Sequence, residues 1–209
     1  GLMAGGLAVA LLSKENAAFV VIGAGLYLLF VHRKVKIGLL VLSVGVAWLI
    51  LIPLVVLPAL GTPQFLATNA GYSLAGKYFS YLGHSPAEML ETLLRKPGTP
   101  LVYVLRPERL QAVLRFSWPT AFLFLLAPEI ALFGLPFLGY LLASNSDAMG
   151  QLAAWYPAVL LPLIYWAVAM GISRVHDHWR AAALILLLLT ATAGYVTLSE
   201  IRPTLWPDM

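Results

Sequence analysis

The chain has 209 residues, of which 61% are hydrophobic and only 11% are charged. Soluble domains carry about 25% charged residues, and a soluble fold of this size leaves too much surface in water to hide so many apolar side chains. The composition therefore predicts an all-α, polytopic integral membrane protein. The basic residues stand in short clusters beside apolar runs, as in loops that flank membrane helices, so the net charge of +4 does not indicate a nucleic-acid partner. The sequence has no cysteine, which excludes disulfides and thiolate metal sites.

The first part of the chain, residues 1–57, predicts three membrane helices, because a bilayer core is crossed by about 20 apolar residues. Residues 1–12 read as the end of one helix, 17–31 as a second and 37–57 as a third. The basic turn 32–36 separates the second from the third, and the positive-inside rule places it in the cytoplasm.

Lys14, Glu15 and Asn16 interrupt the first apolar run. One unbroken helix over residues 1–31 would be about 46 Å long, which exceeds the bilayer core. We therefore expect a turn at the outer membrane surface, with Asn16 capping the next helix. A second interpretation places Lys14 and Glu15 in the rim of a site for the phosphate of a lipid carrier.

Residues 58–116 form the only long polar stretch and predict an outer loop with two amphipathic helices. The first, 85–98, has Ser85 as its N-cap and Glu88 three residues later, which is a capping-box pattern. The second, 107–116, starts at a proline. Both have one apolar face, so we expect them to lie in the membrane interface rather than to cross it.

The apolar run 117–142 is interrupted by prolines and by Glu129. It either crosses once or forms a re-entrant hairpin broken at Pro128 and Glu129, with halves too short to cross alone. We prefer the hairpin, because it shields Glu129 from lipid and places the polar turn 173–180 on the cytoplasmic side.

In total we expect about five to six transmembrane helices, a re-entrant hairpin and two interfacial helices in a single membrane domain. Its parts are the helices of 1–57, the outer loop 58–116 and the C-terminal helices of 117–199, which include the predicted spans 151–172 and 181–199.

Several side chains are candidates for a binding site. Arg106, Arg109 and Arg115 form a basic strip on the outer side, suited either to a lipid phosphate or to ordinary headgroup contact. Glu129 is a candidate buried acid for proton transfer, or else the anion at the N-terminus of a half-helix.

The four histidines are weak candidates for a metal or pigment ligand. His176 and His178 stand two residues apart, a spacing that lets both face one ion or lets one ligate a tetrapyrrole. His32 and His84 stand alone. A protein metal site takes three or four ligands, and none of the histidines has such neighbours in sequence, so we predict no metal site.

Four ordered stretches of the chain resemble a known family. They are SKENAAFVVIGAGLYLLFVHRK, YFSYLGHSPAEMLETLLRKP, LLAPEIALFGLPFLGYLLASNS and WYPAVLLPLIYWAVA. The family consists of predicted bacterial and archaeal membrane proteins (domain of unknown function two-zero-seven-nine), and the match looks like its C-terminal half. The family resembles GT-C type glycosyltransferases, which implies a polyprenyl-phosphate sugar donor on the outer side and a catalytic acid in a first outer loop. No such acidic loop is present in the chain as given.

Two functional hypotheses follow. The first is an accessory or structural subunit of a larger membrane assembly, such as a photosynthetic or other energy-converting complex, in the inner (plasma) membrane. Its apolar helix faces would contact membrane lipids, membrane-protein partners, and a quinone, carotenoid or bacteriochlorophyll. The second is the C-terminal part of a GT-C-like glycosyltransferase. We prefer the first, because the acidic loop that the resemblance requires is missing.

Overall fold

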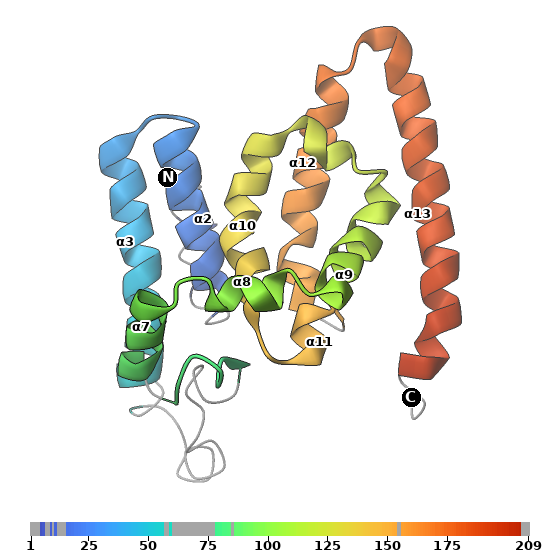
Figure 1. Ribbon diagram of the computed structural model, residues 1–209. Coiled ribbons are helices and arrows are strands. Elements are labelled where there is room, and N and C mark those ends of the chain that lie inside the picture. Colours follow the sequence, from blue (N-terminus) through green and yellow to red (C-terminus); the bar gives the residue numbers. More distant parts are fainter. Residues whose placement is uncertain are drawn as a thin grey trace.

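The computed structural model describes residues 5–6, 9, 11, 16–56, 59, 78–84, 86–153 and 156–205. Every regular element among these residues is a helix, which confirms the all-α prediction (Figure 1). In chain order the elements are α2 (Ala17–Phe30), α3 (Val35–Leu51), the π-helix η1 (Ile52–Val56), α7 (Pro86–Arg95), α8 (Thr99–Val104), α9 (Pro107–Ser117), the 3₁₀ turns η2 (Trp118–Thr120) and η3 (Leu123–Leu126), α10 (Pro128–Ala143), α11 (Asp147–Gly150), the 3₁₀ turn η4 (Tyr156–Val159), α12 (Leu161–Arg174) and α13 (Asp177–Leu205).

Helices α2 and α3 form an antiparallel pair, and α2 also packs against α10 (Figure 1). Glycines allow both contacts. A Cβ added at Gly25 would lie 2.7 Å from the backbone nitrogen of Leu42 in α3, and one at Gly23 would collide with the carbonyl oxygen of Phe133 in α10. The sequence GAG at 23–25 therefore marks close helix packing, as expected from its small residues.

The segment before α10 is a broken helix rather than one continuous half of a hairpin. α9 ends at Ser117, and Pro119 lies inside the 3₁₀ turn that follows. The hydroxyl of Thr120 donates to the carbonyl of Ser117 at 2.7 Å, and Ala121 and Phe122 both have left-handed backbone conformations. A proline cannot donate the hydrogen bond that would continue the α-helix, which explains the break.

The chain reverses direction at Ala127 and Pro128, where the sequence predicted a break, and α10 returns beside the broken segment (Figure 1). The turns at 31–34, 127–128 and 175–176 all lie at one end of the helices (Figure 1), which we call the basic end. Helix α8, α11 and the segment 78–84 lie at the other end, which we call the pocket end.

The C-terminal part differs from the predicted span 151–172. The chain first makes η4 and begins α12 only at Leu161. Proline is tolerated in the first turn of a helix but not in its interior, so one helix cannot contain both Pro157 and Pro162 without a break. α13 has 29 residues and stands at the edge of the molecule, where it contacts η2 through the hydroxyl of Thr190, which donates to the carbonyl of Pro119 at 3.2 Å.

Within the part of the chain that the structure describes, no helix combines the length and the hydropathy needed to cross a membrane.

Candidate functional site

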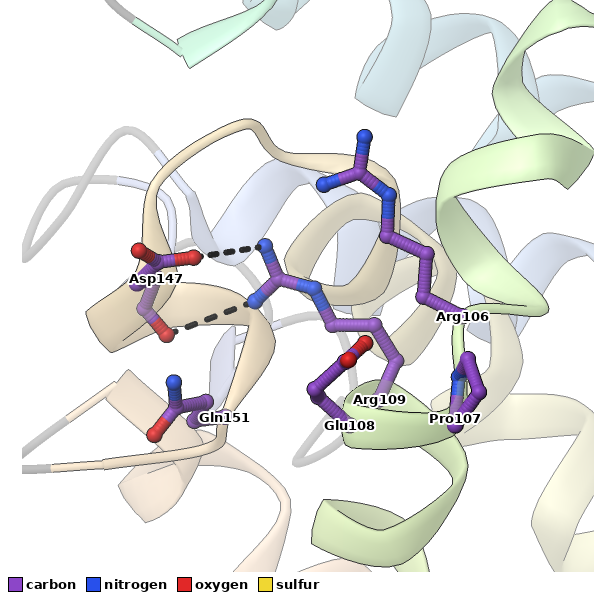
Figure 2. A pocket seen from close by; sticks show the side chains of 6 residues that line it. All are labelled: Arg106, Pro107, Glu108, Arg109, Asp147 and Gln151. Atoms are coloured by element: carbon purple, nitrogen blue, oxygen red, sulfur yellow. Dashed lines mark hydrogen bonds and ion pairs between the residues drawn. The ribbon is translucent and has the colours of Figure 1, made fainter.

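A polar pocket of about 340 Å³ opens at the N-terminus of α9 (Figure 2). Two short stretches supply its lining: Arg106, Pro107, Glu108 and Arg109 come from the start of α9, and Asp147 and Gln151 come from α11 and its end. The pocket therefore lies where the predicted outer loop meets the loop after α10.

Arg109 is the buried centre of this region, with only 2% of its side chain exposed. Its guanidinium donates to the backbone carbonyls of Ser144, Ser146 and Asp147 at 3.2 to 3.3 Å. The Asp147 carboxylate lies 3.5 Å away but is 84% exposed (Figure 2). A Cβ added at Gly150 would overlap the guanidinium, so residue 150 has to be glycine while Arg109 holds this position.

Arg106 has a different environment from Arg109. Its guanidinium lies over the ring of Tyr103, 4.0 Å from the ring centroid, and Tyr103 stacks on Tyr81 with centroids 3.9 Å apart. The hydroxyl of Tyr81 donates to the carbonyl of Ala143 at 2.7 Å. Burial and the neighbouring Tyr103 raise the pKa of Tyr81 to about 12. The stack therefore fixes the exposed Arg106 at the mouth of the pocket.

The loop 143–147 is held from both sides. In addition to Arg109 and Tyr81, the segment 78–84 contacts it through Asn145, whose backbone N–H donates to the carbonyl of Tyr78 and whose side-chain amide donates to the hydroxyl of Ser80, both at 2.8 Å. These bonds place the segment 78–84 and the loop after α10 at the same end of the molecule, and the membrane topology of the hairpin stays a prediction.

The three arginines of the predicted basic strip do not form one surface. Arg106 and Arg109 line the pocket, whereas Arg115 is exposed in the last turn of α9 and is not part of the lining. Arg109 is also buried against carbonyl oxygens and is not open to a headgroup. Since six residues turn an α-helix by about 240° beyond a full turn, Arg109 and Arg115 cannot share a face.

The acceptor side of this pocket was not predicted from the sequence. The polar cluster SNSD at 144–147 between two apolar runs was the available signal. It predicted an outer loop, but nothing in the spacing connected it to Arg109, 35 residues or more earlier.

Lys14 and Glu15 lie outside the described residues, so their proposed role in a phosphate rim stays a prediction. Asn16 stands at the start of α2, but its side chain makes no capping hydrogen bond. Its Oδ1 instead accepts from the hydroxyl of Tyr140 at 3.4 Å. The capping prediction is therefore wrong, because the buried amide is used to join α2 to α10.

Glu129 lies in the first turn of α10 and forms an ion pair with Arg174 from the last turn of α12. Arg174 also donates to the carbonyl of Leu126 at 3.0 Å. The carboxylate is partly exposed and already paired, which matches the interpretation as an anion at a helix N-terminus and not that of an isolated buried acid.

The histidines are divided between the two ends. His32 meets the ring of Tyr27 edge-on, and His176 and His178 lie at the start of α13 with ring centroids 4.5 Å apart. The backbone N–H of His84, in the segment 78–84, donates to Glu88 at 2.9 Å. The described residues contain no group of three His, Cys, Asp or Glu side chains placed to hold a metal ion. A pigment-ligand role for any histidine stays a prediction.

An apolar cavity of about 240 Å³ lies between the second half of α9, η3, α10 and α12. Apolar side chains and one glycine make up nearly all of its wall, among them Val113, Phe116, Gly134, Leu138 and Ile164. Leu125 and Leu135 in its wall are 58% and 50% exposed, so the cavity is open on one side, and its apolar wall suits apolar ligands. The same helix α9 thus contributes its start to the polar pocket and its second half to the apolar cavity.

Comparison with known proteins identifies the family of this chain. A family model described as "Predicted membrane protein (DUF2079)" matches residues 2–203. No curated protein and no solved structure shows significant similarity to the chain. The family resemblance predicted from the four sequence stretches is confirmed, and the chain belongs to this family of predicted membrane proteins.

Proposed function

We propose that this chain is an integral membrane accessory subunit of a larger membrane assembly, and that it holds part of an apolar ligand in the cavity between α9, α10 and α12. The observation that carries the proposal is the cavity itself, whose walls are apolar and whose volume is about 240 Å³. Membership in a family of predicted membrane proteins supports a lipid environment.

The cavity favours some ligands over others. Its volume suits a ring or a segment of chain rather than a whole large molecule. A bacteriochlorophyll would take an axial ligand such as histidine, and the described lining of the cavity contains none. A lipid tail, an isoprenoid quinone or one end of a carotenoid therefore fits the walls better than a tetrapyrrole.

Exposed apolar faces outside the cavity support contact with lipid or with partner subunits. Leu40 on α3 is 65% exposed, and Leu188 and Leu189 on α13 are 66% and 64% exposed. Contiguous apolar surface of this kind indicates a membrane or a protein interface. It lies on the two outermost helices in Figure 1, away from the cavity.

A cavity-filling substitution tests the proposal. A Cβ at Gly134 would lie 3.4 Å from Leu160 and 3.6 Å from Leu163, in ordinary contact, so that a Gly134→Leu side chain would occupy the cavity. Gly139 lies on the same helix with no atom within 4 Å of an added Cβ, which makes Gly139→Leu the matched control.

Both variants and the parent chain would be purified in mild detergent, and bound lipids, quinones and carotenoids would be extracted and quantified by mass spectrometry. We expect Gly134→Leu to lose one apolar ligand per chain and Gly139→Leu to retain it. The same preparation tests the subunit role by co-purification. A parent chain isolated as a monomer, without ligand and without partner proteins, would contradict the proposal.

A second candidate function is a GT-C-like glycosyltransferase that uses a polyprenyl-phosphate sugar donor, favoured by the polar pocket. Arg106 presents a guanidinium suited to a phosphate, while Glu108, Asp147 and Gln151 present acceptors for sugar hydroxyls. Binding of a short-chain polyprenyl phosphate by the purified protein would test it. We expect loss of binding in Arg106→Gln and not in Arg115→Gln, and equal binding by both variants would exclude this pocket.

A further inference from the structure

Three turns that are distant in sequence lie at the basic end of the molecule (Figure 1). They are the α2–α3 turn, the reversal before α10 and the α12–α13 turn. Five cationic side chains belong to them, against two carboxylates: Arg33, Lys34, Lys36, Arg174 and Arg180 against Glu129 and Asp177.

Both carboxylates are already paired. Glu129 pairs with Arg174, and Asp177 pairs with Arg180 at 2.6 Å. This leaves the three cations of the α2–α3 turn without a carboxylate partner among the residues that the structure describes. All three are exposed.

The α2–α3 turn holds its cations in a defined arrangement. Arg33 has a left-handed backbone conformation with φ 53°, and the N–H of Lys34 donates to the carbonyl of Leu28 at 2.9 Å. α3 begins directly after it, so Lys36 lies in the first turn of that helix. A short turn closed by hydrogen bonds keeps the three charges within a small area.

Large apolar side chains are exposed at the same end of the molecule. Phe30 at the end of α2 is 69% exposed, Val35 at the start of α3 is 56% exposed, and Trp179 in the first turn of α13 is 60% exposed. Tryptophan beside basic residues is typical of the boundary between lipid tails and headgroups.

The pocket end has a different charge balance. Its described cations are nearly matched by carboxylates: Arg95 pairs with Glu91 at 2.8 Å, and the buried Arg109 faces Asp147. The excess of positive charge is therefore a property of one end and not of the whole surface.

We propose that the basic end is a binding surface for the phosphate groups of anionic phospholipids in the cytoplasmic leaflet, with Arg33, Lys34 and Lys36 as its main contacts. A basic cluster at the cytoplasmic side is attracted by the negative potential of that leaflet, each cation contributing about a fivefold gain in binding. The proposal rests on the membrane location of the proposed function, and it places the polar pocket on the opposite side.

The test measures phosphatidylglycerol and phosphatidylcholine binding with matched acyl chains, by native mass spectrometry of the detergent-purified protein. The variant Arg33→Gln, Lys34→Gln, Lys36→Gln removes the unpaired cations. The control Arg95→Gln, Lys96→Gln, Arg115→Gln removes as many exposed cations elsewhere. We expect the parent chain to prefer phosphatidylglycerol. At about fivefold per cation, the loss of three cations should weaken binding by the first variant about a hundredfold, and the control should change little.

Equal affinity of the parent chain for the two lipids would overturn the proposal, as would equal weakening in both triple variants. High salt should abolish the preference of the parent chain for phosphatidylglycerol, because salt screens exposed charges. This measurement uses the parent chain alone and so does not depend on the folding of a variant. Gly134→Leu separates this proposal from the cavity: it should keep the lipid preference while losing the apolar ligand. Failure of the protein to float with vesicles in a density gradient would refute both proposals together.

Discussion

The contact between Arg109 and Gly150 gives the sharpest prediction for the polar pocket. In the structure the guanidinium occupies the space that a side chain at position 150 would need. Gly150→Ala must therefore displace Arg109 from the carbonyls of Ser144, Ser146 and Asp147. The loop 143–147 would lose its buried anchor without any change in the arginine itself.

The expected cost follows from the burial of Arg109. Hydrogen bonds to a charged group contribute about 1.5–3 kcal/mol each, and the displaced guanidinium can turn into the polar pocket that it already lines. We expect Gly150→Ala to lower the free energy of unfolding by about 1.5–3 kcal/mol. In an Arg109→Ala background the added methyl group enters vacated space, so the same substitution should be nearly neutral there.

The assay is a double-mutant cycle on the two positions, with unfolding free energies measured by denaturant titration in mixed micelles. The control is Gly139→Ala on α10, where an added Cβ meets nothing within 4 Å and where alanine should stabilise the helix by about 0.5–1 kcal/mol. We expect a coupling energy of about 1.5–3 kcal/mol, which is the cost of Gly150→Ala in the parent chain minus its near-zero cost in the Arg109→Ala background. Additive effects, within about 0.5 kcal/mol, would refute the placement of the guanidinium.

Two further predictions concern the ends of the molecule. Tyr81→Phe keeps the stack on Tyr103 but removes the hydrogen bond to Ala143, and should cost about 1 kcal/mol. The fold raises the pKa of Tyr81 from its ordinary value to about 12 and so favours the neutral phenol. This stabilisation is fully present below about pH 10 and is lost as the pH rises toward 12. A phenolate absorption titration should therefore show one late-ionising tyrosine that Tyr81→Phe lacks, and its presence in both proteins would contradict the prediction. At the basic end, a double-mutant cycle on Glu129 and Arg174 should give a larger coupling energy than one on Glu91 and Arg95, because the second pair is more exposed. Equal coupling energies would show that the Glu129–Arg174 ion pair does not hold α10 to α12.

Several helix boundaries were predictable from the sequence, because the residue patterns that start and end helices are local. The amphipathic segments 85–98 and 107–116 correspond to α7 and α9 within a few residues, since proline starts both. The basic turn 32–36 also separates two helices as predicted. Proline, glycine and charge patterns act over a few residues, so no knowledge of the tertiary structure was needed to interpret them.

The sites could not be predicted in the same way, because they depend on contacts between distant residues. Arg109 read as an interfacial cation, yet its partners lie on a loop 35 residues or more away. Asn16 read as a helix cap, yet its side chain bonds to Tyr140, 124 residues away. Each of these polar side chains can bond either to neighbours in sequence or to distant residues, and the packing of α2, α9 and α10 determines which of the two forms.

The distribution of charge along the fold is an independent argument for a membrane location. The described ion pairs lie at the basic end and at the pocket end: three are in turns or in first or last helical turns, and the Glu91–Arg95 pair lies within the short helix α7. Between those ends, the stretches 17–30, 37–51, 130–143 and 161–173 contain no Asp, Glu, Lys or Arg. A helical protein in water would gain nothing from excluding charge from the exposed middle of its helices, whereas in hydrocarbon an unpaired charge is expensive. Arg109 and Glu129 are consistent with this pattern, because each lies near an end and each is paired there.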